Sequence, residues 1–224
     1  MDFSFLPIYY IYFLDGIKLT LLISVVSVFL GTILGVILYV MKKSTFSIFK
    51  IKIFKVIASI YIEIIRGTPI YLQIMIVYYA TAQLLNLDVS ALFSGIIAIS
   101  LNSAAYVSEL IRAGIDAVDK GQMEAARSLG MNYGVAMVLV IIPQAIKNIL
   151  PAIGNEFIAV IKESSIASTI GVAELMYAAN KVTGAIFRSF EPLIISACCY
   201  FILTYSLGQL VKYMERRMNT DVTN

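Results

Sequence analysis

Charged and hydroxyl side chains gather at residues 160–169, "VIKESSIAST", inside an apolar part of the sequence. A charge near the middle of a bilayer costs at least about 2.5 kcal/mol, so such a side chain is expected to face a partner or a watery cavity. Lys162 and Glu163 are adjacent and would point about 100° apart on a helix, which prevents a good mutual ion pair. We expect a polar cavity in which Glu163 receives the cationic part of a ligand and Ser164 helps to hold its polar head. The alternative is a structural Glu163 that neutralises Arg66 or a lysine.

A second polar stretch, "EIIRGTP" at residues 63–69, interrupts an apolar run that is too long for one straight span. Pro69 lacks an amide donor and disfavours helix in the residue before it. Unwound backbone at membrane depth is tolerated only where protein or a watery cavity satisfies its polar groups, so this break should border a cavity. The Arg66 guanidinium could there bind a substrate carboxylate through two hydrogen bonds, or pair with Glu63 on its own helix. The substrate-binding candidates in this stretch are Arg66, Gly67 and Thr68.

Asn102 and Ser103 lie about halfway along a third apolar run. Polar side chains at that depth line a pore or form hydrogen bonds to a neighbouring helix, and both interpretations remain open for these two candidates. Glu109 and Arg112, nearer the end of the run, are predicted to be a structural pair.

Composition places these residues in a membrane. Hydrophobic residues make up 60% of the 224 residues, only 14% are charged, and the mean hydropathy is +0.88. Continuous apolar runs predict spanning helices and not the alternating segments of a β-barrel. We expect an all-α membrane protein, with Cys198 and Cys199 as small apolar residues and no nucleic-acid partner.

Five spans are predicted, at about residues 17–41, 56–85, 91–113, 135–161 and 192–211. The fourth region should form two helices because it contains Pro143 and Pro151. By the positive-inside rule, the basic loop after the first span and the basic C-terminal segment are cytoplasmic, which leaves the N-terminus outside. We expect residues 162–191 to be irregular and residues 1–224 to form a single transmembrane domain. The cations that support or complicate this topology are Lys42, Lys43, Lys50, Lys52, Lys55, Lys212, Arg216 and Arg217 inside, and Lys18, Lys181 and Arg188 outside.

A loop at about residues 114–143 carries a distinct motif, "KGQMEAARSLGMNYGVAMVLVIIPQA". Residues 122–129 should form a short cytoplasmic helix, Gly130 should end it in a left-handed conformation, and a second helix should run to Pro143. Small alanines allow close approach of another protein, and Glu124 could pair with its basic groups. The candidate docking residues are Gln122, Glu124, Ala125, Ala126, Leu129 and Gly130.

Glu124-Ala125-Ala126, with Gly130 and Pro143 at their spacing, resemble the "EAA" signature of permease subunits of ABC importers. The flanking stretches at 63–69, 102–122, 141–165 and 171–175 ("GVAEL") are similar to the polar amino acid subfamily, and most of all to its homodimeric arginine, histidine and lysine type. The resemblance covers about residues 10–217. It implies a type I importer permease (MetI-like) fold with five core helices, a location in the bacterial cytoplasmic membrane, and a coupling helix that docks in the ATPase subunit.

The resemblance also implies the partners: a second permease subunit, two cytoplasmic ATP-binding subunits, and an extracellular or periplasmic amino acid binding protein. The chain has no G-x-x-x-x-G-K-[ST] sequence, so ATP and Mg should bind the partner ATPase, and we expect neither a cofactor nor a metal in this chain. Basic amino acids are the expected substrates, with glutamine, glutamate or another polar amino acid as the alternative. A passive channel and a Ser-Lys hydrolase built on Lys162 and Ser165 are remote alternatives, whereas the absence of histidine excludes HExxH and Ser-His-Asp chemistry.

Overall fold

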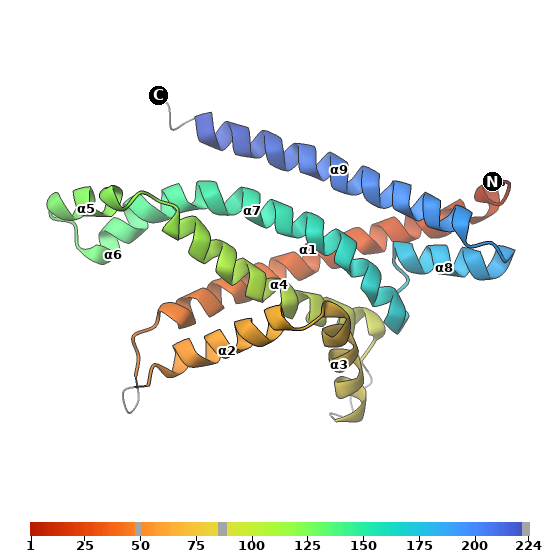
Figure 1. Cartoon of the computed structure of the whole chain (residues 1–224), viewed down its shortest axis with the longest axis horizontal. Helices are drawn as coiled ribbons and strands as arrows, with labels where there is room; N and C mark the ends of the chain where they lie inside the picture. Colours follow the sequence, from red (N-terminus) through yellow and green to blue (C-terminus); the bar gives the residue numbers. More distant parts are fainter. Residues whose placement is uncertain (48–50, 85–88, 221–224) are drawn as a thin grey trace.

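Long helices packed side by side make up the molecule, with shorter helices at both ends (Figure 1). The computed structural model describes residues 1–47, 51–84 and 89–220. Lys50 of the predicted basic loop and residues 86–88 of the predicted outer turn therefore lie outside the described residues.

The first half of the chain contains two long helices and a bent pair. They are α1 (Leu6–Lys43), α2 (Ile53–Gly67), α3 (Ile70–Gln83) and α4 (Ala91–Asp116). The axes of α2 and α3 differ in direction by 112° at the Gly67–Pro69 break, so α3 points away from the long helices in Figure 1.

The second half contains the short helices α5 (Lys120–Ser128) and α6 (Tyr133–Ala136), followed by a π-helical turn η1 (Met137–Ile141) and α7 (Ile142–Glu163). A 3₁₀ segment η2 (Ser164–Ile170), α8 (Leu175–Ile186) and α9 (Phe190–Thr220) complete the chain. Within the described ranges four helices are long and apolar enough to cross a membrane, or five if the bent α2–α3 pair is one span. An all-helical membrane fold is thereby confirmed.

The α1–α4 contact is the most extensive packing between helices in the molecule. Gly31 and Gly35 of α1 allow it, because a Cβ added at Gly35 would lie 2.8 Å from the Val107 Cγ1 of α4, and one at Gly31 would lie 2.9 Å from the Ser103 Cβ. The small-residue pattern of α1 thus brings α4 close to it, as such patterns do between membrane helices.

Two predictions about helix boundaries are wrong. The region around Pro143 and Pro151 is not divided into two helices: it is helical from Tyr133 to Ile170. Pro143 sits in the first turn of α7, where a missing N–H is harmless, and the wider π turn comes just before it. Pro151 lies inside α7, which continues past it. The predicted irregular stretch 162–191 is also largely helical, as η2 and α8.

The three cations predicted on the outer side all have partners within the first 15 residues of the chain. Lys18 pairs with Asp15 at 2.8 Å, Arg188 pairs with Asp2 at 2.7 Å, and the Lys181 ammonium lies 4.4 Å from the Tyr12 ring centroid. The backbone N–H of Ser4, with the hydroxyl of Ser4 and the Arg188 guanidinium, holds the pKa of the Asp2 carboxyl below its usual range.

Candidate functional site

The break between α2 and α3 exposes the three candidates predicted there. Thr68 is extended (φ −121°, ψ 146°), and Arg66, Gly67 and Thr68 are all exposed. The Arg66 guanidinium lies 5.8 Å from the Tyr106 ring centroid. In the described part of the chain Arg66 forms no ion pair with Glu63, so the predicted alternative within α2 is not what the structure contains.

The side-chain amide of Gln73 in α3 donates hydrogen bonds to backbone carbonyls at the break. The Nε2 of Gln73 donates to the backbone oxygens of Ile65 and Thr68, and the Nδ2 of Asn102 donates to the Oε1 of Gln73 at 2.9 Å. Asn102 therefore bonds a neighbouring helix, which was one of its two predicted roles. Sequence reasoning missed Gln73, although an amide four residues after Pro69 in an apolar helix was a usable signal.

Carboxylates cluster near the end of α7. Glu163 is half-buried, and so is Glu156, two turns earlier on the same face and near enough for the two charges to repel each other. Glu156 also approaches Ser103 of α4, which is fully buried and whose hydroxyl has no hydrogen-bond partner of good geometry among the described residues. Glu156 is a second residue that sequence reasoning passed over, and its spacing from Glu163 was the available signal.

Ser164 is placed differently from its neighbour Glu163. Ser164 is fully buried, and its hydroxyl donates to the Ile161 carbonyl at 2.8 Å. Lys162 is exposed. Neither Glu156 nor Glu163 forms an ion pair within the described ranges of the chain. Two unpaired carboxylates at the end of one helix make a place where a cation would be attracted.

The two parts of the candidate site lie close together. The end of α7 lies beside α3 and the start of α4 in Figure 1, and η2 contacts both α3 and α4. A cavity of ≈ 260 Å³, lined mainly by apolar side chains of α2, α3 and α4, lies at the bend. Asn102 is joined to the break through Gln73, and Ser103 neighbours Glu156, which lies two turns before Glu163 on α7.

A separate charge cluster lies towards the other end of α4. Glu109 bonds Lys42 of α1 at 2.6 Å and Arg112 at 2.9 Å, and Arg112 also bonds Asp116 at 3.0 Å. The predicted Glu109–Arg112 pair is confirmed. Through Lys42 the cluster joins α1 to α4, and it does not contribute to the candidate site.

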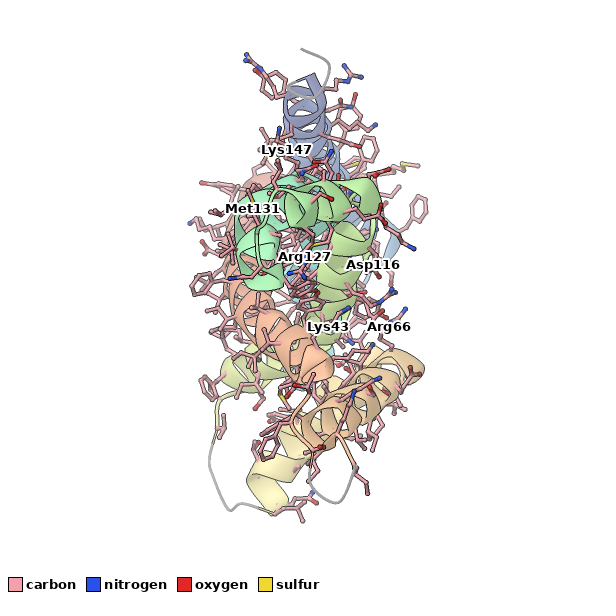
Figure 2. The ribbon with its side chains drawn as sticks, turned by 90° about the vertical axis from the view of Figure 1, so that its left-hand side faces the viewer. Lys43, Arg66, Asp116, Arg127, Met131 and Lys147 are labelled. Atoms are coloured by element: carbon pink, nitrogen blue, oxygen red, sulfur yellow. The ribbon has the colours of Figure 1, made fainter. Side chains whose placement is uncertain are left out.

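The loop between α4 and α7 forms a compact hairpin at one end of the molecule, in front of the long helices in Figure 2. The Asp119 carboxylate caps α5 by accepting from the backbone N–H of Gly121, and the Asn132 side chain caps α6 by accepting from Val135. Gly130 is left-handed (φ +89°), and the backbone N–H of Met131 reaches back to the carbonyl of Ala126 at 3.2 Å. These bonds form the Schellman ending expected from the glycine.

Most candidate docking residues of α5 are available to a partner. Leu129 is 80% exposed, and Gln122, Glu124, Ala125 and Gly130 are also exposed. Ala126 is only 4% exposed, so it packs inside this chain. Gln122 additionally accepts a hydrogen bond from the Gln144 amide of α7 at 3.3 Å, which ties α5 to the start of that helix.

Comparison with known proteins identifies the family of this architecture. Residues 31–220 match the family described as "Binding-protein-dependent transport system inner membrane component". The chain is 45% identical to the "Arginine transport system permease protein ArtQ" of Bacillus subtilis (strain 168), over 94% of each chain. It is 40% identical to the "Putative glutamine transport system permease protein GlnP" of Rickettsia bellii (strain RML369-C), over 93% of each chain.

Solved structures agree with these relatives. A crystal structure of an amino acid ABC transporter with histidines superposes with a TM-score of 0.92 at 46% identity, covering 97% of this chain and 99% of the other. An inward-facing structure of the MetNI methionine ABC transporter superposes with a TM-score of 0.75 at 18% identity, which supports the fold alone.

Proposed function

This chain belongs to the family of binding-protein-dependent transport system inner membrane components, and we propose that the amino acids it carries are basic. The coarser function follows from family membership: the chain is a permease subunit of an amino acid ABC importer in the bacterial cytoplasmic membrane, with a MetI-like fold. It is a membrane transport subunit and not an enzyme. Such an importer implies an ATPase and a binding protein as partners.

The pair Glu156 and Glu163 carries the proposal of a basic substrate. Both are carboxylates of a membrane-spanning helix, and neither forms an ion pair with a described residue. Ionisable residues at such depth usually mark a transport pathway. A guanidinium, ammonium or imidazolium side chain would complement their charge, while Arg66 and Thr68 hold the substrate's carboxylate.

Glutamine or glutamate is the second candidate substrate, because relatives named for glutamine share 40% identity with this chain over nearly its whole length. In that case Glu163 and Glu156 would serve the structure of the pathway and not bind a cation.

The assembly belongs to the same proposal. Two copies of the chain would enclose the pathway, and two ATP-binding subunits, which hold ATP and Mg, would dock on the exposed residues of α5. An extracellular or periplasmic binding protein would deliver the substrate at the end of the molecule where α1 begins, so the N-terminus lies outside and the C-terminus inside. The basic residues on the other side support this orientation.

The test is ATP-driven uptake of radiolabelled arginine into vesicles that contain this chain, its ATPase and its binding protein, with unlabelled amino acids as competitors. Competition by lysine and histidine, and none by glutamine or glutamate, is the expected result. Competition by glutamine or glutamate alone would contradict a basic substrate and leave the importer function intact.

A further inference from the structure

The break between α2 and α3 creates a specific shortage of hydrogen-bond donors. In a continuous helix the carbonyl of Ile65 would accept from the backbone N–H of residue 69, and Pro69 has none. Thr68 is extended, so its carbonyl takes no part in the hydrogen bonding of the helix. An unpaired backbone group in the hydrocarbon region costs several kcal/mol, so the shortage must be met from elsewhere.

Gln73 meets this shortage. Its Nε2 lies 2.8 Å from the Ile65 oxygen, 3.0 Å from the Thr68 oxygen and 2.9 Å from the Thr68 Oγ1. The side chain is 8% exposed and stands in the first turn of α3. The amide therefore replaces the N–H that Pro69 lacks and closes the end of α2 from the side of α3.

The other end of the same amide is held by α4. The Oε1 of Gln73 accepts from the Nδ2 of Asn102 at 2.9 Å, and Asn102 is 4% exposed. Acceptors lie on one side of the Gln73 amide and a donor on the other, so a single orientation of the amide satisfies both. One side chain thus joins α2, α3 and α4 at the point where Arg66 and Thr68 are exposed.

We propose that Gln73 is a positioning residue for substrate passage, which holds residues 66–68 at the break in the place where the substrate meets them. This rests on the proposed function, because Arg66 and Thr68 are the groups that would receive the substrate's carboxylate. Gln73 itself is buried behind the break and acts through those residues.

The test uses Gln73→Met, which keeps the length and approximate volume of the side chain and removes both its donors and its acceptor. Gln83→Met is the matched control, because Gln83 is an exposed residue at the end of the same helix. Gln73→Glu serves if Gln73→Met does not accumulate, since a carboxylate still accepts from Asn102 but has no N–H for α2.

Two measurements are made on the complete transporter. The first is uptake kinetics. Gln73→Met should raise the KM for the transported amino acid about fivefold, the factor expected when the substrate loses one hydrogen bond to residues 66–68. The second is the electron paramagnetic resonance spectrum of a spin label attached at Gly67→Cys. The protein also carries Cys198→Ala and Cys199→Ala, so that only the new cysteine takes the label. A Cβ at Gly67 meets nothing within 4 Å, so the label fits there. Gln73→Met should add a mobile component to that spectrum, and Gln83→Met should change neither reading.

An unchanged label spectrum overturns the inference, because residues 66–68 are then held without Gln73. A mobile label with an unchanged KM also overturns it, because the hydrogen bonds of Gln73 then have no part in substrate passage. If the wild-type transporter imports no basic amino acid, the proposed substrate fails. The KM comparison is then made with the amino acid that the transporter does import, and the label spectrum can be read independently.

Discussion

The buried carboxylate of Glu174 joins α8 to α9, and a double-mutant cycle should measure how strongly. Glu174 has no exposed surface, and it caps α8 by accepting from the backbone N–H groups of Met176 and Tyr177 at 2.9 and 2.8 Å. The Tyr200 hydroxyl of α9 donates to the same carboxylate at 2.6 Å. Next to Glu174, the backbone N–H of Leu175 donates to the hydroxyl of Thr20 in α1 at 3.2 Å.

The expected energies follow from these bonds. Tyr200→Phe removes one hydrogen bond to a charged group and should lower the free energy of unfolding by about 2 kcal/mol. Glu174→Ala loses the cap, worth about 1 kcal/mol, and leaves the Tyr200 hydroxyl without its partner, which costs roughly 2 kcal/mol more. Because both variants lose the same bond, the double variant should be about as unstable as Glu174→Ala alone, which gives a coupling energy of about 2 kcal/mol.

The measurement is chemical unfolding of the four purified proteins in mixed detergent micelles, where the free energies can be compared under one set of conditions. Tyr205→Phe, at an exposed tyrosine of the same helix, should change the free energy by less than about 0.5 kcal/mol. If the effects of Glu174→Ala and Tyr200→Phe add within about 0.5 kcal/mol, the two side chains do not act together and the reasoning is refuted.

Four further outcomes are expected. Gly35→Leu should lower the free energy of unfolding by about 1–3 kcal/mol, because its Cβ would already collide with α4. Glu124→Lys should leave ATP hydrolysis running while ATP-driven uptake is lost, because it reverses a contact charge on the exposed face of α5. Glu163→Gln should weaken binding of a basic amino acid by about 1.5–3 kcal/mol, the range for a hydrogen bond to a charged group. The lowered pKa of Asp2 means that its carboxylate stabilises the fold above the usual carboxyl pKa and that this contribution is lost as the pH falls, so Asp2→Asn should remove that part of the acid sensitivity of unfolding.

Matched variants control three of these experiments. Gly184→Leu, where a Cβ would meet nothing within 4 Å, should cost less stability than Gly35→Leu. Glu215→Lys and Glu63→Gln, both at exposed acids, should leave coupling and substrate affinity unchanged. Coupled uptake by Glu124→Lys, wild-type affinity in Glu163→Gln, or an acid response that survives in Asp2→Asn would each count against the role given to that residue.

Local signals predicted the end of α5 well. The left-handed conformation of Gly130 follows from a helix-ending rule that involves only neighbouring residues. Hydropathy located the membrane helices for a similar reason, since each span is recognised by its own composition.

Pairings between distant residues could not be predicted in the same way. Gln73 bonds Asn102 across 29 positions, and Tyr200 reaches Glu174 across 26, so neither bond leaves a periodic trace in the sequence. The error at Pro143 has another cause: whether a proline breaks a helix depends on the turn before it, and a π turn cannot be read from residue types alone.

Because α7 is one continuous helix, a tilt at one of its ends moves the other end. Its 22 residues span about 33 Å, from the end tied to α5 through Gln122 and Gln144 to the end that carries Glu163. A tilt of about 5° at the α5 end, with the helix rigid, would carry the far end sideways by about 3 Å, roughly the length of a hydrogen bond. Small movements of the hairpin between α4 and α7 are therefore large enough to make or break contacts at the Glu163 carboxylate.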